Sequence, residues 1–329
     1  MKRILSCLLL VALLVGCAPK TASHQVTYLN LFDTVTTILS CSGTEAEFQR
    51  QTEEIYRQLQ TFHRLFDIYN DYEGIQNLKT VNDRAGVEPV QVDPAVIRLL
   101  KDCKQYYALT EGRVNVAMGS VLRLWHEARQ TGTIPDRQAL DQAAAHTVMD
   151  HLILDETQGT VFLADPQMSL DVGTIAKGWA VQRVAEAAPA GLLISVGGNV
   201  YVTGAKTGEA TPWVIGIQHP DDSGKYLHTL TITGGAVVTS GDYQRYITVD
   251  GQKYHHIIDP DTQMPAALWR SVTVVGPDSA LADALSTALF LLPLEQGQAL
   301  AEKCGVEALW VDTEGRETMT AGFAALLQS

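Results

Sequence analysis

The feature that most constrains the fold is a series of short β-rich runs that begins at His151 and continues almost to the end of the chain. Turn residues such as Asp250-Gly251 separate the runs, a pattern typical of strands joined by tight turns. The expected strands are Leu152–Leu154, Thr160–Leu163, Leu192–Val196, Trp213–Ile217, Leu230–Thr233, Ala236–Thr239, Tyr246–Val249, Ser271–Val275 and Ala308–Val311. Because helices intrude after Gly173, Ser279 and Pro293, we expect an α+β fold with a largely antiparallel sheet core and packed helices.

The first half of the chain is dominated by helix signals that follow one strand or hairpin at Val26–Ser40. Residues 44–47 (TEAE) have the spacing of a capping box, and apolar residues follow them at helical spacing. Asp93 precedes Pro94, which is the pattern of a cap followed by proline at the first helical position. A further helix is expected over residues 116–129.

The first residues have the parts of a secretory signal: a short cationic start, an apolar run and a small residue before Cys17. The apolar run is too short to span a bilayer, which needs roughly 20 residues. Residues 14–17 (LVGC) resemble a bacterial lipobox, which implies that Cys17 carries lipid; an uncleaved anchor or a plain signal peptide is the alternative. The expected organisation is a signal peptide with lipobox at 1–16, a tether at 17–25 and one domain at 26–329, whose helix-rich part (about 26–150) and β-rich part (about 151–329) form two intimately associated subdomains.

The charge of the chain excludes one class of partner. Its formal net charge is −13, and removal of Lys2 and Arg3 with the signal would make it −15. Such an acidic surface argues against nucleic acid and makes a polyphosphate hard to bind without a cation. The chain contains no CxxC pair, so we expect neither a zinc site nor a disulfide framework, and Cys41, Cys103 and Cys304 are expected to be small core residues.

Four polar segments beside apolar stretches indicate a polar site, because buried polar groups cost free energy unless they are paired or bind something. They are residues 171–178 (DVGTIAKG), 239–243 (TSGDY), 255–260 (HHIIDP) and 283–287 (DALST). The first leads into a helix, where backbone N–H groups and Lys177 would attract an anion; a solvated lysine after a turn is the alternative. A fifth segment, 194–199 (ISVGGN), allows either a tight turn or close approach of a ligand to the backbone.

The histidine and aspartate segments suggest distinct roles. His255 and His256 would face opposite sides of a strand, so one can be structural while the other hydrogen-bonds a phosphate or moves a proton, or neither has a task. Asp283 and Thr287 are four residues apart in an expected helix capped by Ser279 and therefore share a face. They offer two oxygen ligands to Mg²⁺, unless they are only a solvated edge.

The order GTIAKG, SVGGN, PWVIGIQHP, TSGDYQRY, HHIIDP and DALST resembles that of the ApbE-type FAD:protein FMN transferases. The resemblance covers nearly all of the chain beyond the signal, and residues 66–69 (FDIY), 110–115 (TEGRVN) and 124–125 (LW) extend it upstream. It implies an ApbE/T-fold-like core and a Mg²⁺-dependent reaction that attaches the FMN part of FAD to a threonine or serine of an acceptor protein and releases AMP. The acceptor would be an FMN-binding domain or a subunit of a membrane redox complex, and a lipid-anchored enzyme would lie on the extracytoplasmic face of the cell membrane.

By the same resemblance, three residues are catalytic, namely Lys177, His256 and Asp283. Those implied as metal ligands are Thr174 (through its main-chain oxygen), Asp283, Ser286 and Thr287. Those implied to contact FAD are Phe32, Ile68, Tyr69, Asn115, Lys177 and His256. His256 or Asp242 would accept the proton of the incoming hydroxyl, with His256 favoured.

Two positions depart from the family pattern. Asn115 stands where members usually carry an acid, so it can form hydrogen bonds but cannot supply charge. Phe32-Asp33-Thr34 stands where members often have Met-Gly-Thr. Two other functions remain open: an FAD pyrophosphatase, in which water replaces the protein hydroxyl, and a lipid-anchored flavin-binding protein without turnover.

Overall fold

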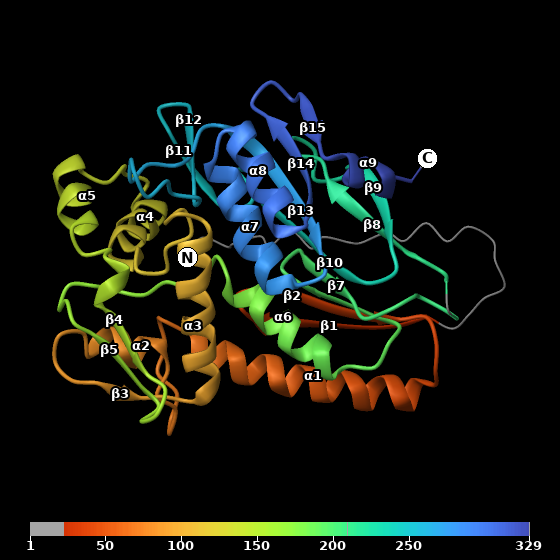
Figure 1. Ribbon diagram of the computed structural model, residues 1–329, viewed down its shortest axis with the longest axis horizontal. Coiled ribbons are helices and arrows are strands. Elements are labelled where there is room, and N and C mark those ends of the chain that lie inside the picture. Colours follow the sequence, from red (N-terminus) through yellow and green to blue (C-terminus); the bar gives the residue numbers. More distant parts are fainter. Residues whose placement is uncertain (1–22, 209, 329) are drawn as a thin grey trace, which may run out of the picture.

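The computed structural model describes residues 23–208 and 210–328, and its centre is an eight-stranded sheet. The strand order is β1-β2-β6-β7-β10-β13-β14-β15, and each neighbouring pair is antiparallel, which confirms the largely antiparallel α+β fold. The strands are β1 (His24–Leu31), β2 (Thr34–Ser40), β6 (Leu192–Val196), β7 (Asn199–Val202), β10 (Gly235–Gly241), β13 (Trp269–Gly276), β14 (Glu307–Asp312) and β15 (Glu317–Met319). Figure 1 shows this sheet with helices packed against it.

Three smaller sheets complete the β structure: β3-β5-β4, β8-β9 and β11-β12. Their strands are β3 (Val90–Gln91), β4 (Leu152–Asp155), β5 (Thr160–Leu163), β8 (Trp213–Gln218), β9 (Tyr226–Ile232), β11 (Tyr246–Val249) and β12 (Gln252–His255). All nine runs expected from the sequence are strands. The sequence reading missed β3, β7, β12 and β15, which are short, and β7 follows β6 after only two residues.

The first hairpin joins the two halves of the chain. β1 begins at His24, so the last two residues assigned to the tether belong to the sheet. β2 pairs with β6, for example Thr36 with Val196, so the expected boundary near residue 150 does not separate two sheets. The reason is that Val26–Ser40 alternates in polarity and has one face to bury, which it does by extending the β-rich part.

The helices are α1 (Glu45–Phe66), α2 (Leu78–Asp83), α3 (Pro94–Leu109), α4 (Gly119–Thr131), α5 (Arg137–Ala144), α6 (Ala176–Ala187), α7 (Ser279–Leu291), α8 (Leu294–Cys304) and α9 (Ala321–Leu326), with one 3₁₀ turn, η1 (Met149–His151). The capping box at Thr44 is present, and Asp93 caps α3 with proline at its start. The expected cap of α7 was wrong by one residue: Asp278 accepts from the Leu281 N–H, and Ser279 is the first helical residue.

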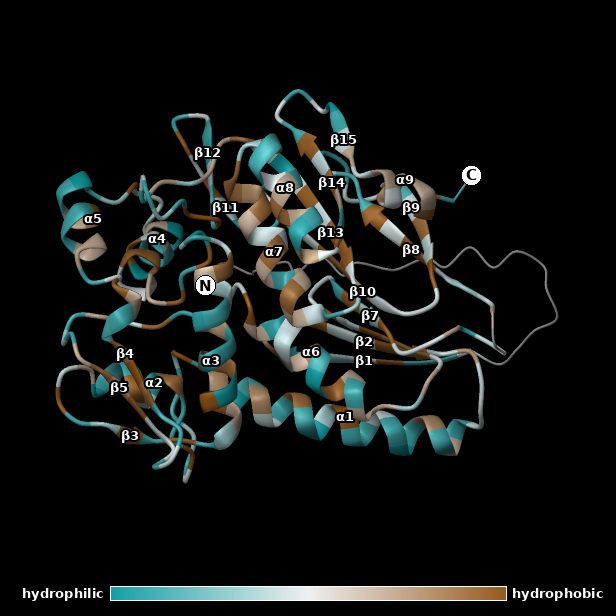
Figure 2. Ribbon diagram, viewed as in Figure 1, coloured by the Kyte–Doolittle hydropathy of each residue, from teal (hydrophilic) through white to brown (hydrophobic). Residues whose placement is uncertain are grey.

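The central sheet is covered on both faces. α6 and α7 pack on one face, with α1 beside α6 (Figure 1). The β8–β9 ribbon and α9 lie on the other, in a separate apolar cluster. β14 shows the alternation that this requires: Ala308 and Trp310 join the core on the helical side, whereas Leu309 and Val311 join the cluster under the ribbon. Figure 2 shows the resulting hydrophobic stretches in β8 and β14 and the mostly hydrophilic surface of α1.

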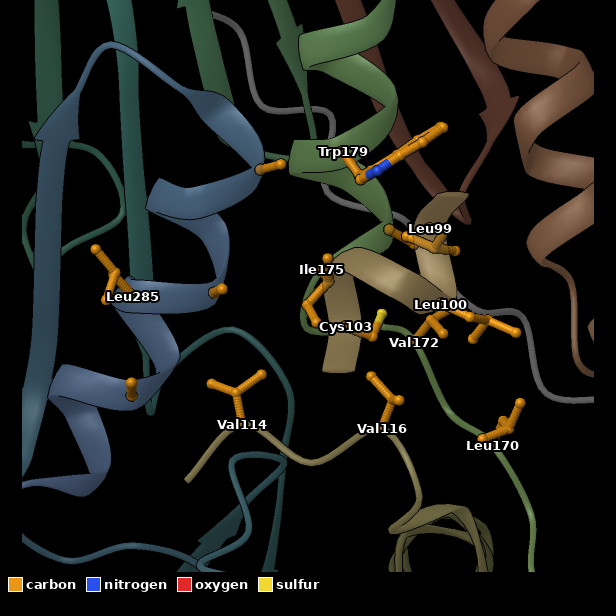
Figure 3. Packing of buried hydrophobic residues seen from close by; sticks show 14 of the residues in the cluster. Leu99, Leu100, Cys103, Val114, Val116, Leu170, Val172, Ile175, Trp179 and Leu285 are labelled. Atoms are coloured by element: carbon orange, nitrogen blue, oxygen red, sulfur yellow. The ribbon is translucent and has the colours of Figure 1, made fainter. Parts of the chain in front are cut away.

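The apolar core beside the start of α6 holds the site in place. Figure 3 shows Ile175 and Trp179 near Leu99 and Cys103 of α3, with Leu285 of α7 to one side. Trp179 is almost fully buried, and its indole N–H donates to Asp102 at 2.7 Å. Burial of such large side chains stabilises the fold by about 2–3 kcal/mol each, which fixes the position of the chain just before and after them.

Two expectations concern the ends and the thiols. Cys41 and Cys103 are buried and Cys304 packs against the core, and all three are free thiols, as expected. None of the helices in residues 23–208 and 210–328 is long and apolar enough to cross a bilayer. The proposed signal, lipobox and lipid-bearing Cys17 lie outside the described residues.

Candidate active site

The centre of the candidate site is a close contact between the first turn of α6 and the middle of α7. Asp283 is buried on α7, and the Gly178 N–H donates to its Oδ2 at 2.8 Å. A Cβ on Gly178 would lie 2.4 Å from both the Asp283 Cβ and the Ser279 carbonyl oxygen, so only glycine permits this approach. The carboxylate is therefore positioned by the backbone of a neighbouring helix.

The environment of Asp283 both opposes and supports its charge. Burial raises the pKa of the carboxyl, while Lys177, the Gly178 N–H and the Asn199 amide oppose that rise. Lys177 Nζ lies 3.9 Å from Asp283 Oδ2 and donates to the Gly173 carbonyl at 3.1 Å. Asn199 is buried at the start of β7, and its Nδ2 makes no hydrogen bond of good geometry. The Lys177 ammonium is thus the charged group that lies within 4 Å of this carboxylate in the described part of the chain.

The start of α6 leaves a main-chain oxygen free. In a regular helix the Gly178 N–H would donate to the carbonyl of Thr174, four residues earlier. Here it donates to Asp283, whereas bonds of this type are present on either side, from Ala176 N–H to the Val172 carbonyl at 2.8 Å and from Trp179 N–H to the Ile175 carbonyl at 2.9 Å. The Thr174 oxygen therefore lacks its usual partner, which is compatible with the ligand role that the family resemblance implies.

The hydroxyls of α7 lie next to strand β10. Ser286 Oγ donates to the Asp283 carbonyl at 2.9 Å and lies 2.8 Å from Ser240 Oγ. Thr287 Oγ1 has only a long contact, 3.4 Å, to the same Ser240 Oγ. Both residues are buried. Thr287 therefore retains more of its hydrogen-bonding capacity than Ser286, whose proton is donated to Asp283 and which keeps one free lone pair.

The donor set fits a hard divalent cation better than a soft one. One carboxylate, hydroxyl oxygens and a main-chain oxygen are the ligands of Mg²⁺, which commonly uses one or two carboxylates and keeps positions for water and phosphate. Within the described part of the chain, no group of three or more His, Cys, Asp or Glu residues could hold a metal ion.

The two adjacent histidines have different environments, as the alternation of a strand predicts. His255 ends β12 and is buried; its Nε2 lies 2.7 Å from the Ala266 carbonyl, and its Nδ1 accepts from the Ile257 N–H at 3.2 Å. His255 is therefore structural. His256 has a buried Nδ1 without a hydrogen-bond partner. Its pKa is lowered to about 3 by burial first and then by the charges of Arg245, His255, Lys177 and Arg129.

Asp242, the alternative proton acceptor, is held in a separate ion pair. Its Oδ2 accepts from Arg270 Nε at 2.8 Å, and its N–H donates to the Arg270 carbonyl at 3.0 Å. Arg270 also contacts Asp221 Oδ1 at 2.7 Å. Arg270 thus occupies one oxygen of the Asp242 carboxylate, while the other oxygen, Oδ1, is buried without a hydrogen-bond partner.

The residues expected at the FAD ends lie on two loops. Phe32 and Asp33 form the turn of the β1–β2 hairpin with φ values of 50° and 51°, and the Phe32 N–H donates to His63 Nδ1 at 3.2 Å. Ile68 packs against the main core. Tyr69 is 55% exposed, and its ring centre lies 5.4 Å from that of His126. Tyr69 thus presents an aromatic face to solvent next to an imidazole.

Both polar atoms of the Asn115 amide form hydrogen bonds within the protein. Its Nδ2 donates to the Thr147 carbonyl at 2.9 Å, and its Oδ1 accepts from the Ala117 N–H at 2.9 Å. Both polar atoms hold the loop that leads into α4. The structure therefore gives Asn115 a loop-fixing role and leaves one amide N–H and one oxygen lone pair unused, so the implied contact with FAD stays a prediction.

Sequence comparison identifies the family. Residues 32–310 match the model of the ApbE family. The chain belongs to the ApbE family. It is 34% identical to a Klebsiella pneumoniae (strain 342) FAD:protein FMN transferase over 77% of this chain and 82% of that protein. It is 33% identical to the FAD:protein FMN transferase of Treponema pallidum (strain Nichols) over 84% of this chain and 81% of that protein.

Solved structures of ApbE proteins have the same fold. The ApbE protein of Thermotoga maritima has a TM-score of 0.84 and 28% identity, and the match covers 93% of this chain and 100% of that chain. The flavin transferase ApbE of Vibrio cholerae has a TM-score of 0.78 and 28% identity, with the same coverage. The ApbE-like α+β architecture expected from the sequence is confirmed.

Several residues of this ApbE-family site were not singled out from the sequence. Gly178, Asn199 and Arg245 belong to motifs that were recognised, but no role was assigned to them. His126 and Arg129 on α4 were missed entirely. The available signal was their spacing, because polar residues three apart on a helix whose buried face includes Val121 and Trp125 must share another face.

Proposed function

We propose that this protein transfers FMN from FAD to a threonine or serine hydroxyl of an acceptor protein in a Mg²⁺-dependent reaction that releases AMP. The observation that carries the proposal is the buried Asp283 carboxylate, fixed by the Gly178 N–H beside Lys177, with the hydroxyls of Ser286 and Thr287 on the same helix. Relatives that match most of the chain are FAD:protein FMN transferases, which supports flavin transfer as the reaction class.

The proposed reaction is a substitution at phosphorus. The acceptor oxygen forms a bond to the phosphorus of the FMN half, the bond from that phosphorus to the bridging oxygen breaks, and AMP leaves with the bridging oxygen. The acceptor hydroxyl loses one proton, so a base is required. Lys177 places a positive charge next to Asp283, where it would stabilise negative charge that develops on the phosphate oxygens.

His256 is the proposed base. A histidine with a pKa near 3 is neutral at physiological pH and therefore able to accept a proton. Its Nδ1 is buried and has no partner, so it is available to a group that enters the site. The low basicity of the free imidazole would rise once the negative charge of the diphosphate lies beside it.

The proposed Mg²⁺ ligands are Asp283, Thr287, Ser286 and the Thr174 main-chain oxygen. Of the hydroxyls, Thr287 fits this role better because Ser286 already has two partners. When bound, the cation would neutralise the diphosphate and lower the pKa of the incoming hydroxyl. Phe32, Ile68 and Tyr69 are proposed to provide apolar and aromatic surface to the rings of FAD.

The test is to incubate the protein with FAD, Mg²⁺ and an acceptor that contains an FMN-binding domain and to measure the acceptor mass. We expect a mass increase equal to covalently attached FMN, loss of the reaction with chelator and recovery with added Mg²⁺. Free FMN and AMP without acceptor would indicate the pyrophosphatase instead. FAD that stays bound and intact with Mg²⁺ present would indicate the binding protein.

The location and the membrane partner are proposed from the sequence. A lipid on Cys17 would hold the enzyme on the extracytoplasmic face of the cell membrane, where it would meet subunits of membrane redox complexes. Labelling of the full-length chain with a fatty-acid analogue, with Cys17→Ala as control, tests this. Label retained by the Cys17→Ala variant would refute it.

A further inference from the structure

Next to His256 lies a basic group that the proposed reaction does not use, which we call the arginine rim: His126, Arg129 and Arg245. Arg129 is in the last turn of α4, and its Nη2 lies 3.2 Å from His126 Nδ1. Arg245 precedes β11, and its carbonyl accepts from the His256 N–H at 3.1 Å. The rim is thus attached to the loop that carries the proposed base.

The framework that brings these residues together is rigid. α4 packs against β11 through an apolar cluster that includes Trp125 and Ile247. The Trp125 indole N–H donates to the Gln263 carbonyl at 2.8 Å, and its ring lies 6.0 Å from that of Tyr254 on β12. Because this packing fixes the two elements, the backbone segments that carry Arg129 and Arg245 are held near one another in the absence of a ligand, while their long side chains can adjust.

The positive charge of the rim is not neutralised within the protein. Arg113, Arg137 and Arg270 each contact a carboxylate within 4 Å, whereas neither Arg129 nor Arg245 does so in the part of the chain that the structure describes. Asp171 is the carboxylate whose charge acts on Arg129. It already accepts a hydrogen bond from the Gly173 N–H at 2.9 Å. Two arginines that remain unpaired near each other repel, unless an anion joins them.

Two further observations point to an anion with several oxygens. His256 Nδ1 is buried without a partner at the edge of this basic group. Lys177 Nζ lies 3.9 Å from Asp283 Oδ2, and the Arg245 carbonyl accepts from the His256 N–H at 3.1 Å. Asp283 with Lys177 therefore forms one end of the site, and His256 with the arginine rim forms the other. A diphosphate has the charge and the oxygen atoms to bridge them.

We infer that Arg129 and Arg245 bind the diphosphate of the flavin dinucleotide independently of the metal and so select phosphorylated flavins. The inference rests on the proposed function, because it assumes a flavin dinucleotide as the ligand. Arginine suits this role since its planar fork donates two hydrogen bonds to phosphate oxygens. The rim would hold FAD by its phosphates while the aromatic face of Tyr69, which stacks near His126, receives a ring.

The test is equilibrium binding of FAD, FMN and riboflavin to the purified protein in the presence of EDTA, followed by flavin fluorescence. We expect the wild type to bind FAD more tightly than riboflavin, with an affinity that falls as NaCl is raised. Arg129→Gln and Arg245→Gln should each weaken FAD binding by about tenfold, the scale of a lost charge-assisted hydrogen bond, and leave riboflavin binding unchanged. Arg123→Gln, an exposed arginine on the same helix, is the matched control and should have no effect.

The outcomes separate this inference from the proposed function. Unchanged FAD affinity in both rim variants, or wild-type FAD binding that requires Mg²⁺, would overturn it. An equal loss of FAD and riboflavin would also overturn it, because it would mean that the Tyr69–His126 contact had collapsed. A wild type that binds FAD through the rim but never modifies an acceptor would refute the proposed transfer and leave the rim in place.

Discussion

The α6–α7 contact and the arginine rim are two ends of one site that are built in opposite ways. At the contact, Asp283 is buried and held by the Gly178 N–H, so its position depends on how two helices pack. At the rim, Arg245 is exposed and Arg129 is half-buried, and long side chains provide the charge. The difference teaches that the residues proposed for chemistry are fixed by the core, whereas those proposed for recognition can adjust to the ligand.

The strongest test of the difference between the two ends is Asp283→Asn, for which we expect the largest effect on transfer. Transfer should fall by about 100- to 1000-fold, the scale seen when a preorganised electrostatic partner is removed. The fold should survive, because Asn can still accept from the Gly178 N–H. Since burial raises the pKa of Asp283 and so disfavours its charge, the variant measured in EDTA at pH 7 should unfold at the same or a higher urea concentration.

Asp242→Asn is the control for that substitution. Its carboxylate is bound by Arg270 outside α7, so transfer should change far less than with Asp283→Asn. If the two variants lost activity equally, the distinction between the metal carboxylate and the structural one would be wrong. Acceptor mass spectra and urea unfolding of both proteins provide the measurement.

His256→Gln is expected to have the next largest effect. His256 lies at the end of the site that holds the arginine rim. Loss of a general base should slow transfer by about 100-fold. The variant should also change the pH dependence of stability. In the unfolded chain the pKa of His256 is about 6.5, whereas in the folded protein it is about 3. Between these pH values the unfolded state binds more protons than the folded state. The stability of the wild type therefore falls as the pH is lowered through this range.

The stability measurement isolates the contribution of His256, because the shifted pKa values of the neighbouring groups are present in both the wild type and the variant. His255, whose pKa is also lowered by burial, and Asp283 contribute equally to wild type and variant. Urea unfolding at pH 7 and pH 4.5 should therefore show a smaller loss of stability for His256→Gln than for the wild type. Identical losses would mean that His256 is not buried as a neutral imidazole.

Gly178→Ala tests whether the contact is as rigid as the comparison requires. The added Cβ would lie 2.4 Å from the Asp283 Cβ and from a backbone oxygen that cannot move without α7. We expect a loss of about 1–3 kcal/mol in unfolding free energy, together with at least roughly tenfold slower transfer. Gly234→Ala is the control, because a Cβ there meets no atom within 4 Å. Wild-type stability and activity of Gly178→Ala would show that the helices can separate freely.

The smallest expected effect is that of Asn115→Asp, which introduces the acid that the family resemblance implies at this position. The new oxygen would face the Thr147 carbonyl in place of the Nδ2 donor, so we expect a loss of about 1–2 kcal/mol from two opposed acceptors. FAD affinity should change little if this residue only holds the loop. A clear gain in FAD affinity would instead restore the binding role that the resemblance implies.

The sequence predicted the elements of this protein better than their connections. The nine β-rich runs and the caps at Thr44 and Asp93 are local patterns, and local patterns are what strand and helix signals report. The pairing of β2 with β6 was not predictable, because it joins residues more than 150 positions apart. The division near residue 150 therefore marks a change in composition across which β2 pairs with β6.

The residues of the site likewise fall into those that local motifs predicted and those that only the structure revealed. Lys177, Asp283, Ser286 and Thr287 were found through their motifs, and the structure brings them together on α6 and α7. The use of the Asn115 amide by the backbone could not be foreseen, because its partner Thr147 lies in another loop. His126 and Arg129 carry no motif; their spacing indicates a shared helix face, but only the packing of α4 against β11 places that face beside the strand that follows Arg245.

The hydrogen bond from Gly178 to Asp283 has a practical consequence. The Gly178 amide proton is sensitive to whether a cation is bound at Asp283. A cation that draws electron density from Oδ2 weakens this hydrogen bond and so changes the rate at which the proton exchanges with solvent. Amide exchange or an NMR shift at this one position would therefore titrate the site in the intact protein, with no dye, coupled assay or acceptor.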